Sequence, residues 1–239
     1  MMINPNGPYP GRQLFLGLTK DNRPCLAYLV TGRSKESRER RAIPVENTVR
    51  MGPLGNIPYD PLRHYTALKY DNAAGVAAIS NGIQTEAVFE TYKLLCNVNS
   101  PLQQEYMAKI MDGANAEPDS YHTPRIAGVI IAGTQPVFII GIKGFEKPAA
   151  ATAVQPTAGT LIGVSTYQGN MDNPAATDPK AALPTIEFDV KTPEELAKYV
   201  FDISQVSYKG DDIRVCAIGL VRSADNRTWD IALINTHQS

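Results

Sequence analysis

The recurrence of apolar, β-favouring runs constrains this 239-residue chain more than any other feature of its sequence. Runs of four to eight residues rich in Val, Ile and aromatic side chains predict strands. They cover residues 13–18, 25–31, 67–70, 76–80, 126–132, 137–142, 160–166, 213–220 and 229–234. Several are apolar at nearly every position, which is typical of strands covered on both faces.

Helical patterns are fewer and do not alternate with the strands. Apolar residues spaced three and four apart predict helices over residues 85–96 and 101–111. A Thr-Pro-Glu-Glu capping box at 192–195 predicts the start of a third helix. Nine strands against three helices, two of them consecutive, favour an α+β fold with mainly antiparallel sheets over a doubly wound α/β fold.

Two long stretches lack either periodicity. Residues 147–159 are rich in Ala, Thr and Pro, and residues 168–184 are rich in Asn, Pro and Ala, so we expect surface loops there. No internal repeat and no linker interrupts the pattern. The sequence therefore predicts a single domain over residues 1–239.

The composition excludes several classes of protein. Hydrophobic residues make up 43% and charged residues 20% of the chain, which is ordinary for a soluble globular protein. The net charge of -1 predicts no nucleic-acid partner, because nucleic-acid-binding domains usually carry a strongly basic face. No apolar run reaches the roughly 20 residues that span a bilayer, and no signal-peptide pattern is visible, so we expect no membrane association.

The cysteines and histidines predict neither disulfides nor a metal site. The three cysteines lie far apart and lack C-x-x-C spacing, which is typical of reduced thiols in a cytoplasmic protein. The three histidines lack the spacing of zinc ligands. We therefore expect a cytoplasmic protein without a bound metal.

Three polar motifs stand at the edges of apolar runs, where packing does not require them. They are G-R-S-x-x-S-R at 32–38, S-N-G-x-x-T at 80–85 and T-P-R-I-A-G at 123–128. Loops at strand ends often form ligand sites, because a rigid sheet holds them in place. The arginines and serines of these motifs predict a cleft for an anionic, polar small molecule.

Each motif also has a purely structural interpretation. The segment 32–41 contains five cations and two acids, which is typical of a solvated loop with internal ion pairs. The Asn81-Gly82 pair favours a turn, with Thr85 as the N-cap of the next helix. Arg125 stands at the mouth of a buried strand, and an ion pair with Glu117 accounts for it as well as a bound anion does.

Taken in order along nearly the whole chain, these motifs resemble those of the archaeal-type IMP cyclohydrolase family. Further matching pieces are Y-P-G-R at 9–12, a strand led by Tyr65, S-T-Y at 165–167 and P-A-A-T at 174–177. The resemblance implies an Ntn-hydrolase-like fold, which is a four-layer αββα sandwich of two mainly antiparallel sheets.

The resemblance also implies a reaction in de novo purine biosynthesis. The substrate would be the purine precursor 5-formamidoimidazole-4-carboxamide ribonucleotide, and the products would be IMP and water, with no metal or organic cofactor. The carboxamide nitrogen must attack the formyl carbon, so the developing oxyanion needs hydrogen-bond donors and the leaving hydroxyl needs a proton. The family tends to associate, which is compatible with a homo-oligomer.

The resemblance assigns roles to particular residues. Arg38 would polarise a substrate oxygen, Tyr65 would relay a proton, and Glu117 would orient or deprotonate the carboxamide. Contacts to the substrate, including its 5′-phosphate, are expected from four further side chains: Arg12, Arg33, Asn81 and Arg125.

The sequence departs from the family's pattern at two positions after Tyr65. Thr66 replaces an asparagine, whose amide can both donate and accept hydrogen bonds, and Lys69 replaces an arginine. Two other functions therefore stay open: a cyclising or amide-processing enzyme acting on a related nucleotide, and a nucleotide-binding protein of the same fold without turnover. Arg38, Tyr65 and Glu117 around one cavity would favour an enzyme, whereas Glu117 turned to solvent would favour a binding protein. A purely structural protein would show no concave site bearing these arginines.

Overall fold

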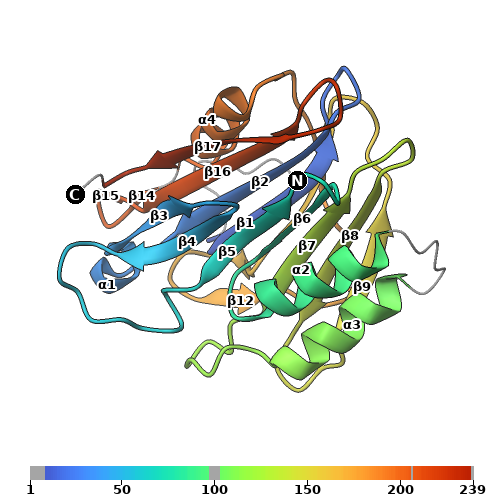
Figure 1. Cartoon of the computed structure of the whole chain (residues 1–239). Coiled ribbons are helices and arrows are strands. Elements are labelled where there is room, and N and C mark those ends of the chain that lie inside the picture. Colours follow the sequence, from blue (N-terminus) through green and yellow to red (C-terminus); the bar gives the residue numbers. More distant parts are fainter. Residues whose placement is uncertain (1–8, 97–102, 206, 238–239) are drawn as a thin grey trace.

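The computed structural model describes residues 9–96, 103–205 and 207–237, and two antiparallel sheets form its centre (Figure 1). The six-stranded sheet contains, in spatial order, β13 (Thr185–Glu187), β10 (Thr160–Ser165), β1 (Arg12–Leu18), β2 (Pro24–Thr31), β16 (Arg214–Arg222) and β17 (Trp229–Asn235). The seven-stranded sheet contains β3 (Arg40–Val45), β4 (Thr48–Pro53), β5 (Thr66–Asp71), β6 (Val76–Ser80), β7 (Arg125–Ile131), β8 (Val137–Lys143) and β9 (Ala150–Val154).

Short elements and four helices complete the described chain. The helices are α1 (Lys35–Arg38), α2 (Gln84–Leu95), α3 (Gln103–Ala114) and α4 (Pro193–Ile203). Two small hairpins pair β11 (Tyr167–Gly169) with β12 (Pro174–Ala176), and β14 (Ser207–Tyr208) with β15 (Asp211–Asp212). The prediction of few helices and mainly antiparallel strands is confirmed.

The two sheets pack against each other through one apolar cluster. This cluster joins residues of β1, β2 and β16 to residues of β4 through β8. Gly128 in β7 lets the sheets approach closely, because a Cβ there would lie 3.1 Å from Leu14 and 3.2 Å from Leu16 of β1. The main core of the protein therefore lies between the sheets.

The helices bury the outer faces of both sheets. The apolar side of α4, formed by Leu196, Ala197 and Val200, packs on the six-stranded sheet. Residues of α2 and α3 pack on the seven-stranded sheet, as Figure 1 shows. Every residue of β2 and β7 is consequently buried, which explains why these strands are apolar apart from Thr31 at the end of β2 and Arg125 at the start of β7.

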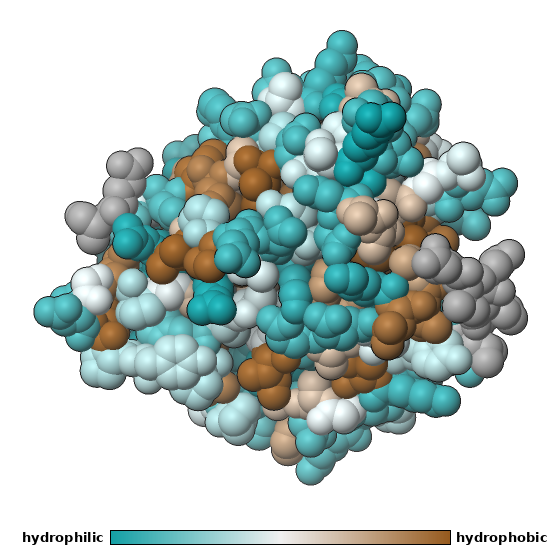
Figure 2. Space-filling model, in the orientation of Figure 1, coloured by the Kyte–Doolittle hydropathy of each residue, from teal (hydrophilic) through white to brown (hydrophobic). Residues whose placement is uncertain are grey.

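The edge strand β17 is less well covered. Its residues Ile231 and Leu233 are half-buried against the central core, and Ala232 and Ile234 against α4. Figure 2 shows hydrophobic groups gathered over this strand, with hydrophilic side chains around them. None of the described helices is long and apolar enough to cross a bilayer.

The predicted strands and helices are confirmed, with one correction at a helix start. The capping box is present, since the Thr192 hydroxyl accepts from the Glu195 amide at 3.2 Å and the Glu195 carboxylate accepts from the Thr192 amide at 3.2 Å. Helix α3 begins at Gln103 in the described chain, and residues 101–102 lie outside it. The prediction of Thr85 as an N-cap is wrong, because its hydroxyl lies inside α2 and donates back to the Gly82 carbonyl.

Eight strands and one helix of the described chain were not predicted: β3, β4, β9, β13, the four strands of the two small hairpins, and α1. The stretches 147–159 and 168–184, expected to be loops, contain β9, β12 and most of β11. β3 and β9 are the two edges of the seven-stranded sheet, where strands need less apolar surface. β3 carries two arginines and a proline, which an edge strand tolerates, and β9 consists mainly of alanine. α1 lies in the charged segment 32–41, which has a structural interpretation as a solvated loop, and β4 lacks a continuous apolar run because Arg50 lies within it.

Gly219 allows α4 to lie directly on β16. A Cβ at this position would lie 2.2 Å from the carbonyl oxygen of Pro193 and 2.8 Å from the amide nitrogen of Ala197. Because backbone atoms cannot rotate away, we expect Gly219→Ala to lower the free energy of unfolding by about 2 kcal/mol. Urea titration followed by circular dichroism measures this change.

Gly113 in α3 provides the matched control. A Cβ there meets no atom within 4 Å, so Gly113→Ala should raise the free energy of unfolding by up to about 1 kcal/mol, since alanine favours helices. Destabilisation of similar size in both variants would show that the close approach of α4 is not the cause.

Candidate active site

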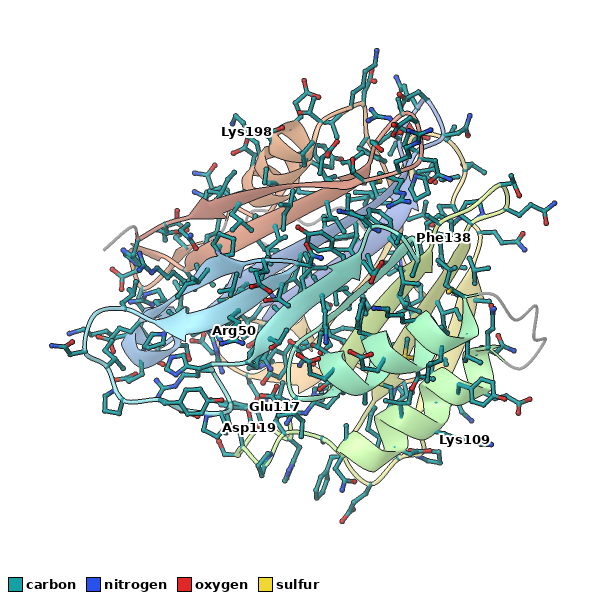
Figure 3. All side chains as sticks on the ribbon, viewed as in Figure 1. Arg50, Lys109, Glu117, Asp119, Phe138 and Lys198 are labelled. Carbon is teal, nitrogen blue, oxygen red and sulfur yellow. The ribbon has the colours of Figure 1, made fainter. Side chains whose placement is uncertain are left out.

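A polar cavity of about 470 Å³ opens at the end of the sheets where β1 and β3 begin. Its volume is within the range of small-molecule sites. The residues that line it are mainly charged or aromatic: Tyr9, Arg12, Arg33, Ser34, Ser37, Arg40, Asp119, Tyr121, Tyr167, Asp172, Tyr208, Lys209 and Asp211. Figure 3 shows Glu117 and Asp119 together at this end, while Phe138, which lines a second cavity, lies at the opposite end. We call the first cavity the polar cleft.

Glu117 joins both sheets at this end. It lies in the segment between α3 and β7 and is only 2% exposed. Its Oε1 accepts hydrogen bonds from Arg12 Nη2 at 2.5 Å and from Arg125 Nη1 at 3.1 Å. Arg12 begins β1 of the six-stranded sheet, and Arg125 begins β7 of the seven-stranded sheet. The ion pair between Arg125 and Glu117 that the structural interpretation predicted is therefore present.

Asn81 holds this arrangement from the end of β6. Its Nδ2 donates to Glu117 Oε1 at 3.2 Å and to the Pro124 carbonyl at 2.9 Å. Its Oδ1 accepts from the Ile126 amide at 2.9 Å and from Gln84 Nε2 at 3.0 Å. Each of these four hydrogen bonds joins the Asn81 side chain to another group of the protein. Asn81 is therefore placed to position Glu117.

The charges in this cluster do not balance. Burial lowers the pKa of Arg12, but Glu117 and nearby tyrosines raise it more, so the pKa of Arg12 lies well above its ordinary value. For Arg125, burial is the largest effect and Arg12 adds to it, so its pKa is lowered despite Glu117. Arginine stays protonated in proteins in either case. Two positive charges therefore face one carboxylate.

Tyr65 also connects the two sheets. It precedes β5 and pairs with Met51 of β4 through two backbone hydrogen bonds of 2.8 and 3.2 Å. Its hydroxyl lies 3.0 Å from the hydroxyl of Tyr28 in β2. Burial, followed by the neighbouring Tyr65, raises the pKa of Tyr28 well above its ordinary value, so Tyr28 keeps its proton. Tyr65 also contributes to raising the pKa of Arg12, which places its phenol near the Glu117 cluster.

Arg33 is fixed between two tyrosines at the mouth of the polar cleft. Its guanidinium carbon lies 4.8 Å from the ring centre of Tyr9 and 4.9 Å from that of Tyr121. Its Nη1 donates to the Met171 carbonyl at 2.6 Å. These contacts hold the segments around residues 33, 121 and 171 together.

A chain of hydroxyl groups leads from the cleft wall towards Arg12. Asp119 accepts from the Thr123 amide at 2.8 Å and from the Thr123 hydroxyl, which also bonds to the Tyr167 hydroxyl. Burial raises the pKa of Tyr167 to about 12. Tyr167 therefore stays protonated, and it stacks on Tyr9 with ring centres 5.4 Å apart.

Arg38 lies apart from this cluster. Its Nη1 donates to the carbonyls of Gly32 and Arg33, at 3.3 and 2.8 Å, and its Nη2 pairs with Asp211 at 2.7 Å. Arg12, Asn81, Glu117 and Arg125 converge and Tyr65 lies beside them, whereas Arg38 joins α1 to β15. The predicted catalytic role of Arg38 stays a prediction that its contacts do not support.

Several residues of the site were not predicted. Tyr28 lies inside a uniformly apolar run that shows no polar signal, and Arg40 was counted only as part of a charged segment. Tyr9 and Tyr167 belong to the Y-P-G-R and S-T-Y pieces, so those motifs could have indicated them. Among the described residues, no three of His, Cys, Asp or Glu gather at metal-binding distance.

Two stacked antiparallel sheets flanked by helices, with an arginine-bearing polar cleft at one end, define an α+β protein. The sequence profile of the family described as IMP cyclohydrolase-like protein matches residues 9–226, and the chain belongs to this family.

Proteins named IMP cyclohydrolase are similar to this chain. The one from Methanocaldococcus jannaschii is 35% identical over 124 residues, which are 51% of this chain and 56% of that protein. One from Methanococcus maripaludis is 29% identical over 82% of this chain and 89% of its own length. One from Thermococcus kodakarensis is 25% identical over 94% of this chain and 96% of its own length.

The central carboxylate can be tested through stability. Glu117→Gln leaves two buried guanidinium groups without a counter-charge, so we expect the free energy of unfolding to fall by about 3 kcal/mol. The exposed Glu187→Gln is the control and should change it little. Urea titrations of the two variants measure the difference, and equal stabilities would mean that Glu117 does not neutralise the two arginines.

Proposed function

We propose that this chain closes the purine ring of 5-formamidoimidazole-4-carboxamide ribonucleotide and releases IMP and water. Membership of the IMP cyclohydrolase-like family and the names of its relatives support this proposal. The observation that carries it is the buried carboxylate of Glu117, bound by Asn81, by Arg125 and by Arg12, which lines the polar cleft. Glu117 is buried, so it does not meet the expectation for a protein without turnover, but Arg38, Tyr65 and Glu117 are not among the residues that line the polar cleft.

The reaction forms a bond between the carboxamide nitrogen and the formyl carbon, breaks both bonds of the formyl C=O group and leaves a C=N double bond to the former formamido nitrogen. The carboxamide nitrogen attacks the formyl carbon, and the formyl oxygen takes up negative charge. That oxygen leaves as water with one proton from the carboxamide nitrogen and one from the formamido nitrogen. Enzymes accelerate such steps by aligning the two arms of the substrate and by stabilising the oxyanion.

Arg12 is placed to stabilise the oxyanion. It lines the polar cleft, and its Nε–H has no partner among the described residues. An unpaired buried donor gains a hydrogen bond when a substrate oxygen reaches it. We assign to Arg12 the polarising role that the sequence suggested for Arg38, whose guanidinium is already bonded to Gly32, Arg33 and Asp211.

Tyr65 and Glu117 would handle the protons. Tyr28 keeps its own proton and can donate to the Tyr65 oxygen, which leaves the proton of Tyr65 free to move to the departing hydroxyl. Glu117 would orient the carboxamide through the oxygen that is not shared by the three donors. Asn81 would act through Glu117, and Arg33 would close the mouth of the cleft.

The two departures from the family's pattern differ in their relation to this site. Lys69 donates to Glu86 and Glu90 of α2, at 2.7 Å each, on the outer face of the sheet. Its replacement of an arginine is therefore remote from the proposed chemistry. Thr66 follows Tyr65 directly and is half-buried in β5, so it is the departure that bears on substrate choice.

We further propose that the packing of helices on two stacked sheets is the four-layer αββα sandwich of Ntn-hydrolase-like proteins, in a single domain over residues 1–239. The clusters between the sheets and under α2, α3 and α4 support this proposal. A cytoplasmic enzyme that needs neither metal nor cofactor, and a homo-oligomeric state, stay predictions.

The reaction can be followed by the absorbance change on IMP formation. We expect turnover that survives EDTA, and a kcat at least about 100-fold lower in Tyr65→Phe, because the variant loses the proton donor. Tyr70→Phe is the matched control, since Tyr70 is a buried tyrosine of the same core and should leave kcat unchanged.

Other outcomes would favour the alternative functions or change the proposed mechanism. Saturable binding of the ribonucleotide without turnover would indicate a binding protein or a related substrate. Loss of activity in EDTA that returns with a divalent cation would overturn metal independence. Full activity of Tyr65→Phe would remove Tyr65 from the mechanism.

A further inference from the structure

Arg40 is a buried arginine without a carboxylate partner. It begins β3 and is only 2% exposed. Its Nη1 lies 3.5 Å from the Arg63 carbonyl, which is the limit for a hydrogen bond, and its Nε has no partner. No aspartate or glutamate of the described residues forms an ion pair with it. A buried cation without an ion pair and with few hydrogen bonds destabilises the folded protein unless an anion binds to it.

The other buried arginines of the protein have strong partners. Arg12 and Arg125 share the carboxylate of Glu117. Arg222 donates to the carbonyls of Asn72 and Asn226, at 3.0 and 2.7 Å, and lies over the ring of Trp229. Among the described residues Arg222, like Arg40, has no carboxylate partner, but Arg40 differs from all three because the one hydrogen bond of its side chain is 3.5 Å long, and it lies on the wall of the polar cleft.

The neighbours of Arg40 in the cleft suit an anion. Arg33 and Lys209 add positive charge, and the hydroxyl groups of Ser34 and Ser37 line the same wall. Guanidinium and hydroxyl groups together are typical of phosphate sites, because they offer several donors to the phosphate oxygens.

The acids of the cleft are already engaged. Asp211 pairs with Arg38 at 2.7 Å, and Asp172 accepts from the Tyr208 hydroxyl at 2.9 Å. Asp119 is bonded to Thr123. None of these carboxylates neutralises Arg40, so its charge is available to a ligand.

We infer that Arg40 is the centre of a subsite for a phosphate monoester, with Ser34, Ser37 and Lys209 beside it. The inference rests on the proposed function for the identity of the ligand, which would be the 5′-phosphate of the ribonucleotide. The heterocycle then lies towards Arg12 and Glu117. Arg40 thus fixes the orientation of the substrate and rejects nucleosides that lack the phosphate.

Binding of ribose 5-phosphate and of ribose tests the subsite without the heterocycle. Calorimetry should detect ribose 5-phosphate, and not ribose, with the unaltered protein. Arg40→Gln should weaken the binding of ribose 5-phosphate by about 10- to 100-fold, as expected for the loss of a charged hydrogen-bond partner. Arg40→Lys should have an intermediate effect, and the exposed Arg227→Gln, whose side chain is 83% accessible, should have none.

Thermal unfolding supplies a second readout that guards against misfolding. Without ligand, Arg40→Gln should melt at a higher temperature than the unaltered protein, because it removes an unpaired buried charge. Added ribose 5-phosphate should raise the melting temperature of the unaltered protein and not that of the variant. Equal affinity for ribose 5-phosphate in the two proteins would overturn the inference.

The same variants separate this inference from the proposed function. Binding of ribose 5-phosphate that depends on Arg40, in a protein that forms no IMP, would uphold the subsite and reject the cyclohydrolase. Formation of IMP with an unchanged KM in Arg40→Gln would uphold the cyclohydrolase and reject the subsite.

Discussion

One oxygen atom organises the functional end of this protein. Oε1 of Glu117 accepts hydrogen bonds from Arg12, Arg125 and Asn81, which come from the start of β1, the start of β7 and the end of β6. The apolar cluster between the two sheets does not include this group of residues, and here the hydrogen bonds of Glu117 connect the sheets instead. Two buried guanidinium groups need a buried carboxylate as counter-charge. The position of Glu117 therefore fixes Arg12, which lines the polar cleft.

The sequence predicts most of the fold because burial on both faces leaves a strong apolar signal. In the strand Arg125–Ile131 every residue after Arg125 is apolar, and the structure buries the whole strand. Most of the strands that were not predicted lie where a strand does not need to be apolar on both faces. Arg40–Val45 and Ala150–Val154 form edges, and each pairs on one side with the strand next to it in the sequence.

The site was predictable to the extent that its residues stand at recognisable strand ends. Asn81 and Arg125 belong to motifs that flank apolar runs, and they do meet at Glu117. The choice among the arginines of the segment 32–41 could not be made from the sequence. Arg38 closes the small helix α1 and turns to Asp211, whereas β3 begins two residues later and buries Arg40. No periodicity marks that boundary.

The excess positive charge around Glu117 has a consequence for how such a protein changes over evolutionary time. Buried ionic clusters of this kind are often no more stable than well-packed apolar groups of the same volume. Simultaneous apolar replacement of Arg12, Glu117 and Arg125 is therefore a route to a scaffold that is at least as stable. Selection for heat resistance alone would favour this replacement, so the proposed roles of Arg12 and Glu117 in the reaction would account for their remaining charged.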